Sequence, residues 1–343
     1  MIPDDWNCVV TDSPALFAVY AGLTASGYDL VRTAPGEPAS QLIGRLRSAP
    51  WPPSVREYFA AARRGGGGVN PYWPRAYLLA LTALHLEDEA PWALSDPAAF
   101  REQVADLAVD PAERGSAAVA WLERLPGVVS EMMALSFVGP LGADYRAMVG
   151  ARAPSFDAAA RTTVAAVTGR LGVDAGRLPG LTLLPNPLQA QEETDFVPLR
   201  GRIFVIMAEA GAGAIAHELL HHVLGPRLAA CDRVVTSHRG LLAPVIERMR
   251  AFDYAWADDE ASWRRVFEES LVRAATLWVM EGAGDRALQR ARALQRARAE
   301  SEQGFVYVPP LLEHFQGSWA GLEGFEEFVR GGLERCRHFP SMR

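Results

Sequence analysis

Two histidines and a glutamate stand at a spacing that can hold a metal ion and support hydrolysis. The segment AGAIAHELLHHVLGP contains His217, Glu218 and His221. Residues four apart on an α-helix lie one above the other, so two imidazoles can reach the same ion. Glu218 stands beside the same point and could take a proton from water at a zinc ion, which lowers the pKa of that water to about 7. The spacing therefore predicts a Zn²⁺ site with Glu218 as the general base.

The helix expected around this motif is strongly apolar, so its polar side chains need partners. The apolar residues are Ile215, Leu219, Leu220, Val223 and Leu224. Buried imidazoles and carboxylates are unfavourable unless they bind a hydrogen-bond partner or a metal ion. Metal ligation satisfies His217 and His221 together, and the alternative is a pair of core histidines satisfied by capping or by hydrogen bonds. His222 points about 100° away from its neighbour, and we expect it either to support the metal ligands from behind or to be structural.

A catalytic zinc ion needs a third protein ligand and one open position. The metzincin pattern requires Gly at position 224 and His at position 227, whereas this chain has Leu224 and Arg227. That class is therefore excluded. Gly225-Pro226 follows the motif instead, and we expect this pair to end the helix because proline cannot continue the hydrogen-bond ladder.

The third ligand is expected on a later helix, WRRVFEESLVRAATLWVM (263–280), which offers Glu268 and Glu269. This helix is apolar on nearly every side, so two adjacent carboxylates call for a cation. A helical wheel drawn from the apolar residues places Glu268 nearer the core face. An ordinary salt bridge is the alternative for either, Glu268 with Arg264 or Glu269 with Arg273. Three aspartates between the two helices are further candidates: Asp253, Asp258 and Asp259.

The HELLH motif and the later helix together resemble the gluzincins, zinc peptidases with HExxH and a downstream glutamate. Within them the chain is similar to an uncharacterised bacterial group of predicted metallopeptidases, in which a helical N-terminal half precedes a strand and the HExxH helix. Glu269-Ser-Leu-Val-Arg273-Ala matches that group's second motif. The resemblance implies a peptidase whose third ligand is Glu269, with Glu268 in reserve.

A zinc peptidase also needs a donor for the oxyanion that develops on the substrate. The resemblance implies a tyrosine after a Leu-Leu pair near the C-terminus, but this chain has Leu311-Leu312-Glu-His314-Phe315 there. The remaining candidates are Tyr307, His314 and, more remotely, Arg273. We name Tyr307 as the expected donor; the alternative is an aromatic residue packed on an extended segment, FVYVP.

The rest of the chain predicts an α+β fold that is mostly helical. Apolar spacing predicts helices over 16–24, 55–63, 75–86, 98–107, 155–171, 240–252, 259–280 and 285–300, with two more at the C-terminus. Residues 63–74 contain four glycines and are expected to form a loop or hinge. Strand-like runs, 181–188 and 202–208, flank a loop with Glu192, Glu193 and Asp195.

These elements predict a helical N-terminal lobe over residues 1–150 and a zincin-like metallopeptidase domain over 151–343. The lobe is expected to lie over a cleft with the HELLH helix as its floor. The edge strand of the small sheet is expected to be RIFVIMA (202–208), with which an extended peptide substrate could pair.

Composition limits the classes of function. The chain of 343 residues has a net charge of -7, which argues against nucleic acid or an anionic membrane as a partner. No stretch of about 18 apolar residues occurs, so no membrane span is expected. Its three cysteines form no CxxC pair, and the acidic N-terminus does not fit a secretory signal, so a cytoplasmic protein is expected. No GxSxG elbow is present.

Two other classes of function fit the same residues. One is a zinc hydrolase of a non-peptide substrate. The other is a non-catalytic zinc-binding or interaction protein, in which a fourth protein ligand would close the open position.

Overall fold

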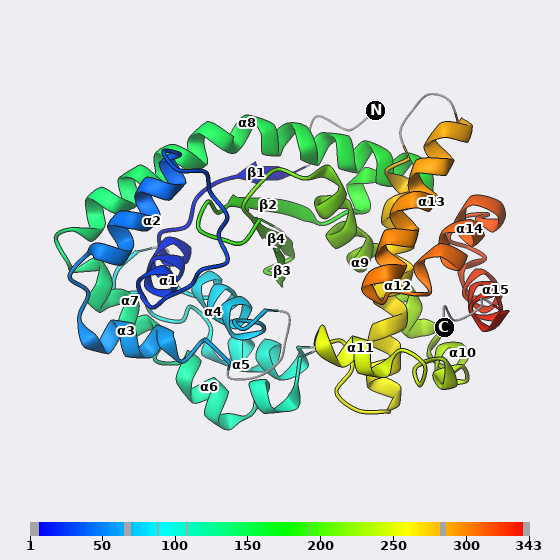
Figure 1. Cartoon of the computed structure of the whole chain (residues 1–343), viewed down its shortest axis with the longest axis horizontal. Coiled ribbons are helices and arrows are strands. Elements are labelled where there is room, and N and C mark those ends of the chain that lie inside the picture. Colours follow the sequence, from blue (N-terminus) through cyan, green and yellow to red (C-terminus); the bar gives the residue numbers. More distant parts are fainter. Residues whose placement is uncertain are drawn as a thin grey trace. The chain divides into compact units, whose positions relative to one another are not determined.

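The computed structural model is mostly helical with one small mixed sheet, which confirms the predicted α+β class (Figure 1). The model describes residues 7–64, 70–87, 89–107, 109–191, 193–281 and 286–338. The chain divides into two compact units. Among the described residues, the sheet unit comprises 7–158 and 180–210, and the motif unit comprises 159–179 and 211–338. The strands, assigned above to the second domain, therefore belong with the N-terminal helices.

The sheet unit is built around one buried helix, α1 (Pro14–Ala25). Every residue of α1 from Ala15 onward is buried, because the segment is apolar on all sides. The other helices of this unit are α2 (Pro38–Ser48), α3 (Pro53–Ala60), α4 (Arg75–Leu84), α5 (Pro97–Asp106), η1 (Pro111–Arg114), α6 (Ser116–Leu122) and α7 (Leu125–Met133). Helix α1 packs against α2, α3, α4 and α7. Helix α8 (Val138–Leu171) is continuous and contributes residues to both units.

The sheet has four strands in the order β1-β2-β4-β3. They are β1 (Cys8–Val10), β2 (Gly180–Pro185), β3 (Thr194–Leu199) and β4 (Arg202–Met207). Strand β4 pairs in parallel with β2 and antiparallel with β3. The prediction that 202–208 forms the edge strand is therefore wrong. The error arises because β3, which pairs with the outer side of β4, lies within the segment that was predicted to be a loop.

The outer edge of β3 is held by side chains of the neighbouring helices. The hydroxyl of Tyr77, on α4, donates to the carbonyl of Phe196 over 3.2 Å, and the amide of Gln103, on α5, donates to the carbonyl of Pro198 over 2.8 Å. Strand pairing by an extended peptide needs such carbonyls as acceptors. Two of them on this edge already have donors.

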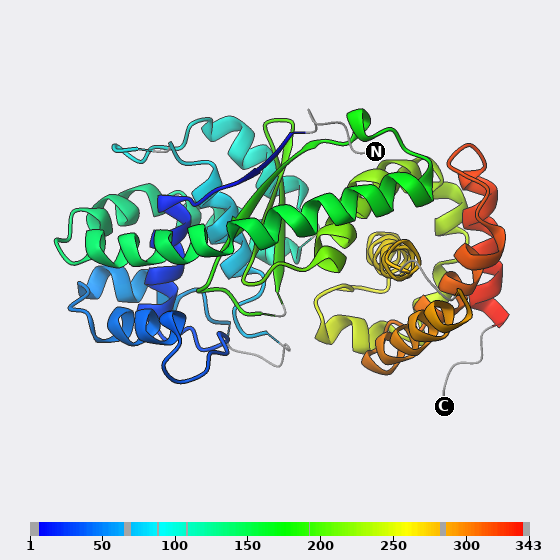
Figure 2. The ribbon, with the colours of Figure 1, turned by 90° about the horizontal axis from the view of Figure 1, so that it is seen from above.

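The motif unit is centred on helix α12 (Glu260–Val279). Its other helices are η2 (Ala175–Arg177), α9 (Ala212–Ala230), α10 (Asp232–Thr236), η3 (Arg239–Leu241), α11 (Ile246–Ala251), α13 (Arg286–Gln303), α14 (Val308–Ser318) and α15 (Phe325–His338). Helix α12 packs against α9, α10, α13 and α14. Figure 2 looks nearly along α12 and shows helices of this unit around it.

Two local predictions in this unit are wrong. Gly225-Pro226 does not end the motif helix, since α9 continues to Ala230. Leu228 is buried beyond the proline, and this packing offsets the lost backbone hydrogen bond. The segment FVYVP is not extended: Tyr307 has φ -87° and ψ -8° and leads directly into α14.

Some predictions fall on residues outside the described ranges. They are the glycine stretch within 65–69 and the position of Glu192. Among the described residues, no single helix has the length and apolar composition of a membrane span. Segments 116–133 and 138–171 have the required length and apolar composition only when they are taken together, and a bend of 103° separates them.

Strand β3 of the sheet unit carries a buried carboxyl group. Asp195, on β3, accepts hydrogen bonds from the Tyr20 hydroxyl over 3.0 Å and from the Gln189 amide over 2.9 Å. Burial raises the pKa of Asp195 to about 7, although the hydrogen bond from Tyr20 lowers it. The folded protein therefore holds this proton at pH values where the unfolded chain releases it.

We expect the stability of the sheet unit to fall as the pH rises from about 4 to about 7, by at most about 1.4 kcal/mol per pH unit from this group. The folded pKa lies above the unfolded one, so the contribution is complete at low pH and is lost as the pH passes the folded pKa. Asp195→Asn should remove this part of the pH dependence. Urea unfolding of the wild type and the variant at several pH values measures it. Asp144→Asn, at an exposed position, is the control, and equal slopes for wild type and Asp195→Asn would contradict the assignment.

Candidate metal centre

Helix α9 presents the two motif histidines as the sequence predicted. Their Nε2 atoms lie 3.2 Å apart and their ring centroids 4.8 Å apart. Both side chains belong to one helical face, since His217 and His221 are one turn apart. Two imidazole nitrogens therefore point at the same place.

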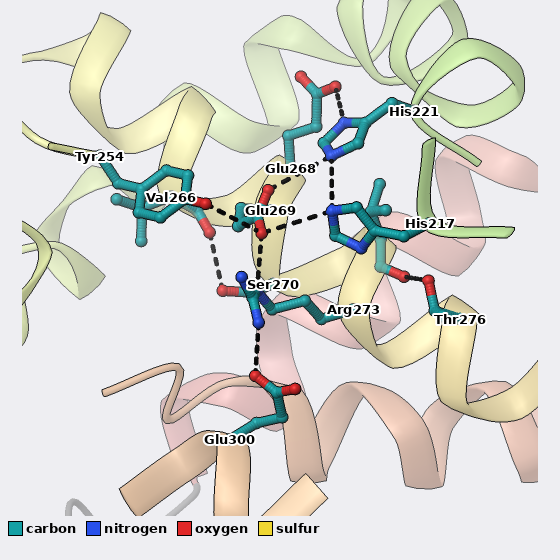
Figure 3. A network of polar contacts seen from close by, with 11 residues as sticks. His217, His221, Tyr254, Val266, Glu268, Glu269, Ser270, Arg273, Thr276 and Glu300 are labelled. Carbon is teal, nitrogen blue, oxygen red and sulfur yellow. Dashed lines mark hydrogen bonds and ion pairs between the residues drawn. The ribbon is translucent and has the colours of Figure 1, made fainter. Parts of the chain in front are cut away.

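Helix α12 brings Glu269 to that place. Its Oε2 lies 3.3 Å from Nε2 of His221, and its Oε1 lies 3.6 Å from Nε2 of His217. One ligand atom from each of the three side chains lies within 4.8 Å of the others, so the group could hold a metal ion. Figure 3 shows the three side chains pointing toward one another from α9 and α12.

The two adjacent glutamates of α12 have different positions, and the helical-wheel indication was wrong. The side chain of Glu269 is 6% exposed, whereas that of Glu268 is 35% exposed. The wheel followed the apolar residues of α12, but the position of α9 against this helix decides which carboxylate meets the histidines. The glutamate expected from the family resemblance is the one in the group.

Glu268 contacts the other nitrogen of His221. Its Oε1 lies 3.0 Å from Nδ1 of that ring, and a carboxylate there accepts the Nδ1 proton and leaves the lone pair on Nε2. Gly225, on α9, leaves room for this contact, since a Cβ at that position would lie 3.0 Å from Oε1 of Glu268. Glu268 is thus placed to orient His221.

The charges of the group attract one positive charge. Burial lowers the pKa of His217 to about 3, against the attraction of Glu269, so this ring is neutral and able to be a ligand. Burial also lowers the pKa of His221, but the hydrogen bonds to Glu268 and Glu269 outweigh it and raise the pKa to about 10. Burial raises the pKa of Glu269, but Arg273 and the two histidines lower it by more. The pKa of Glu269 therefore lies well below its usual value. A proton or a metal ion can supply the charge that this arrangement favours.

Three further side chains in Figure 3 connect to the group. Arg273 donates from Nε to Oε1 of Glu269 over 2.7 Å and from Nη1 to Oε2 of Glu300, on α13, over 2.6 Å. The hydroxyl of Tyr254 donates to Oε1 of Glu269 over 3.4 Å. Tyr254 and Glu300 were not among the predicted site residues, because no local sequence pattern links either residue to the motif.

Glu218 lies on α9 next to His217 and is partly exposed. Its negative charge raises the pKa of His221, which shows that it belongs to the electrostatic surroundings of the group. His222 is exposed, in accord with a position off the ligand face. Asp259, one of the alternative ligands, caps α12 by accepting from the amide of Ser262.

Of the three candidate oxyanion donors, Arg273 belongs to the network, whereas Tyr307 and His314 make their hydrogen bonds elsewhere. The hydroxyl of Tyr307 donates to the carbonyl of Leu241, and its ring packs against Trp263. His314 donates from Nε2 to the carbonyl of Phe328 over 2.8 Å and stacks on that ring. Both polar groups already have backbone acceptors.

None of the family models, curated proteins or solved structures compared with the chain matches it.

Proposed function

We propose that this chain is a zinc-dependent hydrolase that cleaves peptide bonds, with His217, His221 and Glu269 as ligands and Glu218 as general base. The observation that carries the proposal is the meeting of Glu269, from α12, with the two motif histidines of α9. This carboxylate is only 6% exposed, and the hydrogen bond from Arg273 favours its ionised form, so a negatively charged oxygen faces the two imidazole nitrogens. The preference for peptide bonds rests on the resemblance of the two motifs to the gluzincins.

The donor set fits zinc better than a hard cation. Two imidazole nitrogens and one carboxylate oxygen are typical of catalytic zinc, whereas magnesium and calcium prefer all-oxygen sets. The group found among the described residues contains three ligating side chains. Catalytic zinc sites have three protein ligands and structural sites usually four, which favours the hydrolase over a non-catalytic zinc protein.

The site's own residues would divide the work of hydrolysis. A zinc ion held here would supply Lewis acidity toward the substrate carbonyl and toward water. Glu218 would take the proton of the attacking water and pass it to the leaving amine. Glu268 would keep the proton of His221 on Nδ1, so that Nε2 remains a ligand.

Tyr254 replaces Tyr307 as our candidate for the oxyanion donor. Its hydroxyl lies at the edge of the ligand group, 3.4 Å from Glu269. Burial and the charge of Glu269 raise the pKa of Tyr254 well above its usual value, so the hydroxyl keeps its proton; it would have to turn from its long contact with Glu269 to donate to a substrate oxyanion. A donor of this kind stabilises the charge that develops on a carbonyl oxygen.

The wild-type protein should bind one zinc ion per chain and cleave an unstructured protein such as casein. His221→Ala should lose the ion, whereas Glu218→Gln should keep it and cleave casein at least about 100-fold more slowly. Elemental analysis and a casein assay measure both properties. His222→Ala, on the exposed side of the same helix, is the control and should change neither. A wild type without zinc would refute the proposal; zinc with ester cleavage but intact casein would identify a non-peptide hydrolase.

Glu268→Ala should weaken zinc binding roughly 10- to 100-fold, because His221 loses the acceptor that fixes its ring. Competition with a chromogenic chelator measures the dissociation constant. Glu260→Ala, an exposed change on the same helix, should leave the constant unchanged. Equal constants for Glu268→Ala and the wild type would show that the contact with Nδ1 does not orient the ligand.

Tyr254→Phe should lower kcat by roughly 10²- to 10³-fold, the usual loss for one oxyanion donor, with one zinc ion still bound. Tyr307→Phe serves as the matched comparison and should lower kcat less than threefold, since its hydroxyl binds the backbone elsewhere. Steady-state cleavage of a fluorogenic peptide distinguishes the two. A large loss of kcat in Tyr307→Phe alone would restore the original assignment.

A further inference from the structure

Arg273 lies between two carboxylates that come from different helices. Nε donates to Oε1 of Glu269 over 2.7 Å, and Nη1 donates to Oε2 of Glu300 over 2.6 Å. The guanidinium carbon also lies 3.8 Å from the ring centroid of Phe305. The side chains of Arg273 and Glu300 are 24% and 27% exposed, so all three charges are substantially withdrawn from water (Figure 3).

The contacts of Glu269 separate its two oxygens. Oε1 accepts from Arg273 and from the Tyr254 hydroxyl and lies 3.6 Å from Nε2 of His217, whereas Oε2 lies 3.3 Å from Nε2 of His221. A carboxylate held through one oxygen keeps the other for an ion. The side chains behind Glu269 thus favour ligation through one oxygen, which preserves an open position at a three-ligand site.

A fixed positive charge so close to a cation site is unfavourable by itself. Arginine is always protonated. Its positive charge beside one oxygen of Glu269 weakens the electrostatic attraction between that carboxylate and a metal ion at the other oxygen. Glu300 changes this balance, because it contributes a negative charge on the far side of the guanidinium. The net charge of the three side chains Glu269, Arg273 and Glu300 is then -1, whereas the net charge of the Glu269–Arg273 pair alone is zero.

We propose that Glu300 is a positioning residue for the metal centre, which neutralises Arg273 and so lets Arg273 fix Glu269 without weakening its attraction for the ion. This inference rests on the proposed zinc site. Helix α13 would then influence the zinc affinity through Glu300, although Glu300 would not contact the ion.

The competing explanation is that Arg273 and Glu300 merely attach α13 to α12. Such a clamp would change the stability of the fold, but the zinc affinity of the folded protein would not follow the charge at these two positions. Variants that alter charge at constant shape separate the two explanations.

Glu300→Gln is the principal variant, because glutamine keeps the shape and an acceptor oxygen for Arg273 but removes the charge. We expect its zinc dissociation constant to rise roughly 10- to 100-fold, the usual effect of altering an outer-shell partner. The double variant Arg273→Gln/Glu300→Gln should bind zinc at least threefold more tightly than Glu300→Gln alone, because the uncompensated positive charge is removed. Competition with a chromogenic chelator measures the constants at pH 7.5, and circular dichroism of the metal-free proteins confirms that each is folded.

Two controls complete the experiment. Glu302→Gln makes the same change at an exposed position of α13 and should leave the constant within twofold of the wild type. Glu300→Asp keeps the charge and should stay within about threefold, which provides a second test if Glu300→Gln does not fold. A Glu300→Gln constant within twofold of the wild type, a double variant no tighter than the single one, or a loss in Glu300→Asp as large as in Glu300→Gln would overturn the inference. A wild type that binds no zinc would instead refute the proposed function.

Discussion

The buried carboxylate of Glu269 is the constraint on which the motif unit depends. A charge at this position is stable only if cations and donors surround it. Helix α9 supplies two histidines, α12 supplies Arg273 one turn further on, and the segment before α12 supplies Tyr254. The packing of α9 on α12 and of α13 on α12 therefore serves one electrostatic need as well as the apolar core.

Glu268 and Glu269 are neighbours in sequence but make different contacts, because the helix turns them about 100° apart. Glu269 faces the two Nε2 atoms, and Glu268 faces Nδ1 of His221. Substituting either one therefore disturbs a different atom of the same imidazole. Each of the two acidic side chains therefore has a histidine nitrogen as a neighbour.

The sequence was informative where the chemistry is local. His217 and His221 are related by a single helical turn, so their spacing alone predicted their meeting. The third member of the candidate metal group was harder to predict: a helical wheel of α12 indicated Glu268, and the family resemblance indicated Glu269. Tyr254 and Glu300 could not be predicted, because their contacts with Glu269 and Arg273 depend on how separate segments pack.

The same distinction explains the errors in the fold. The long apolar helices and the strands β2 and β4 carry clear patterns, whereas β1 has three residues and β3 begins in an acidic segment. The hydrogen bonds that Tyr20 and Gln189 make to Asp195 allow an acidic residue inside a strand. Likewise, burial of Leu228 carries α9 past Pro226, which a rule based on proline alone would not allow.

The side chains on the outer edge of β3 have a consequence for the protein in concentrated solution. An uncovered strand edge can recruit a strand from another molecule and begin an ordered aggregate. Here Tyr77 and Gln103 engage the carbonyls of Phe196 and Pro198, and Pro198 has no amide proton to donate. At the opposite edge, β1 is only three residues long. The sheet is thereby protected against growth by intermolecular pairing.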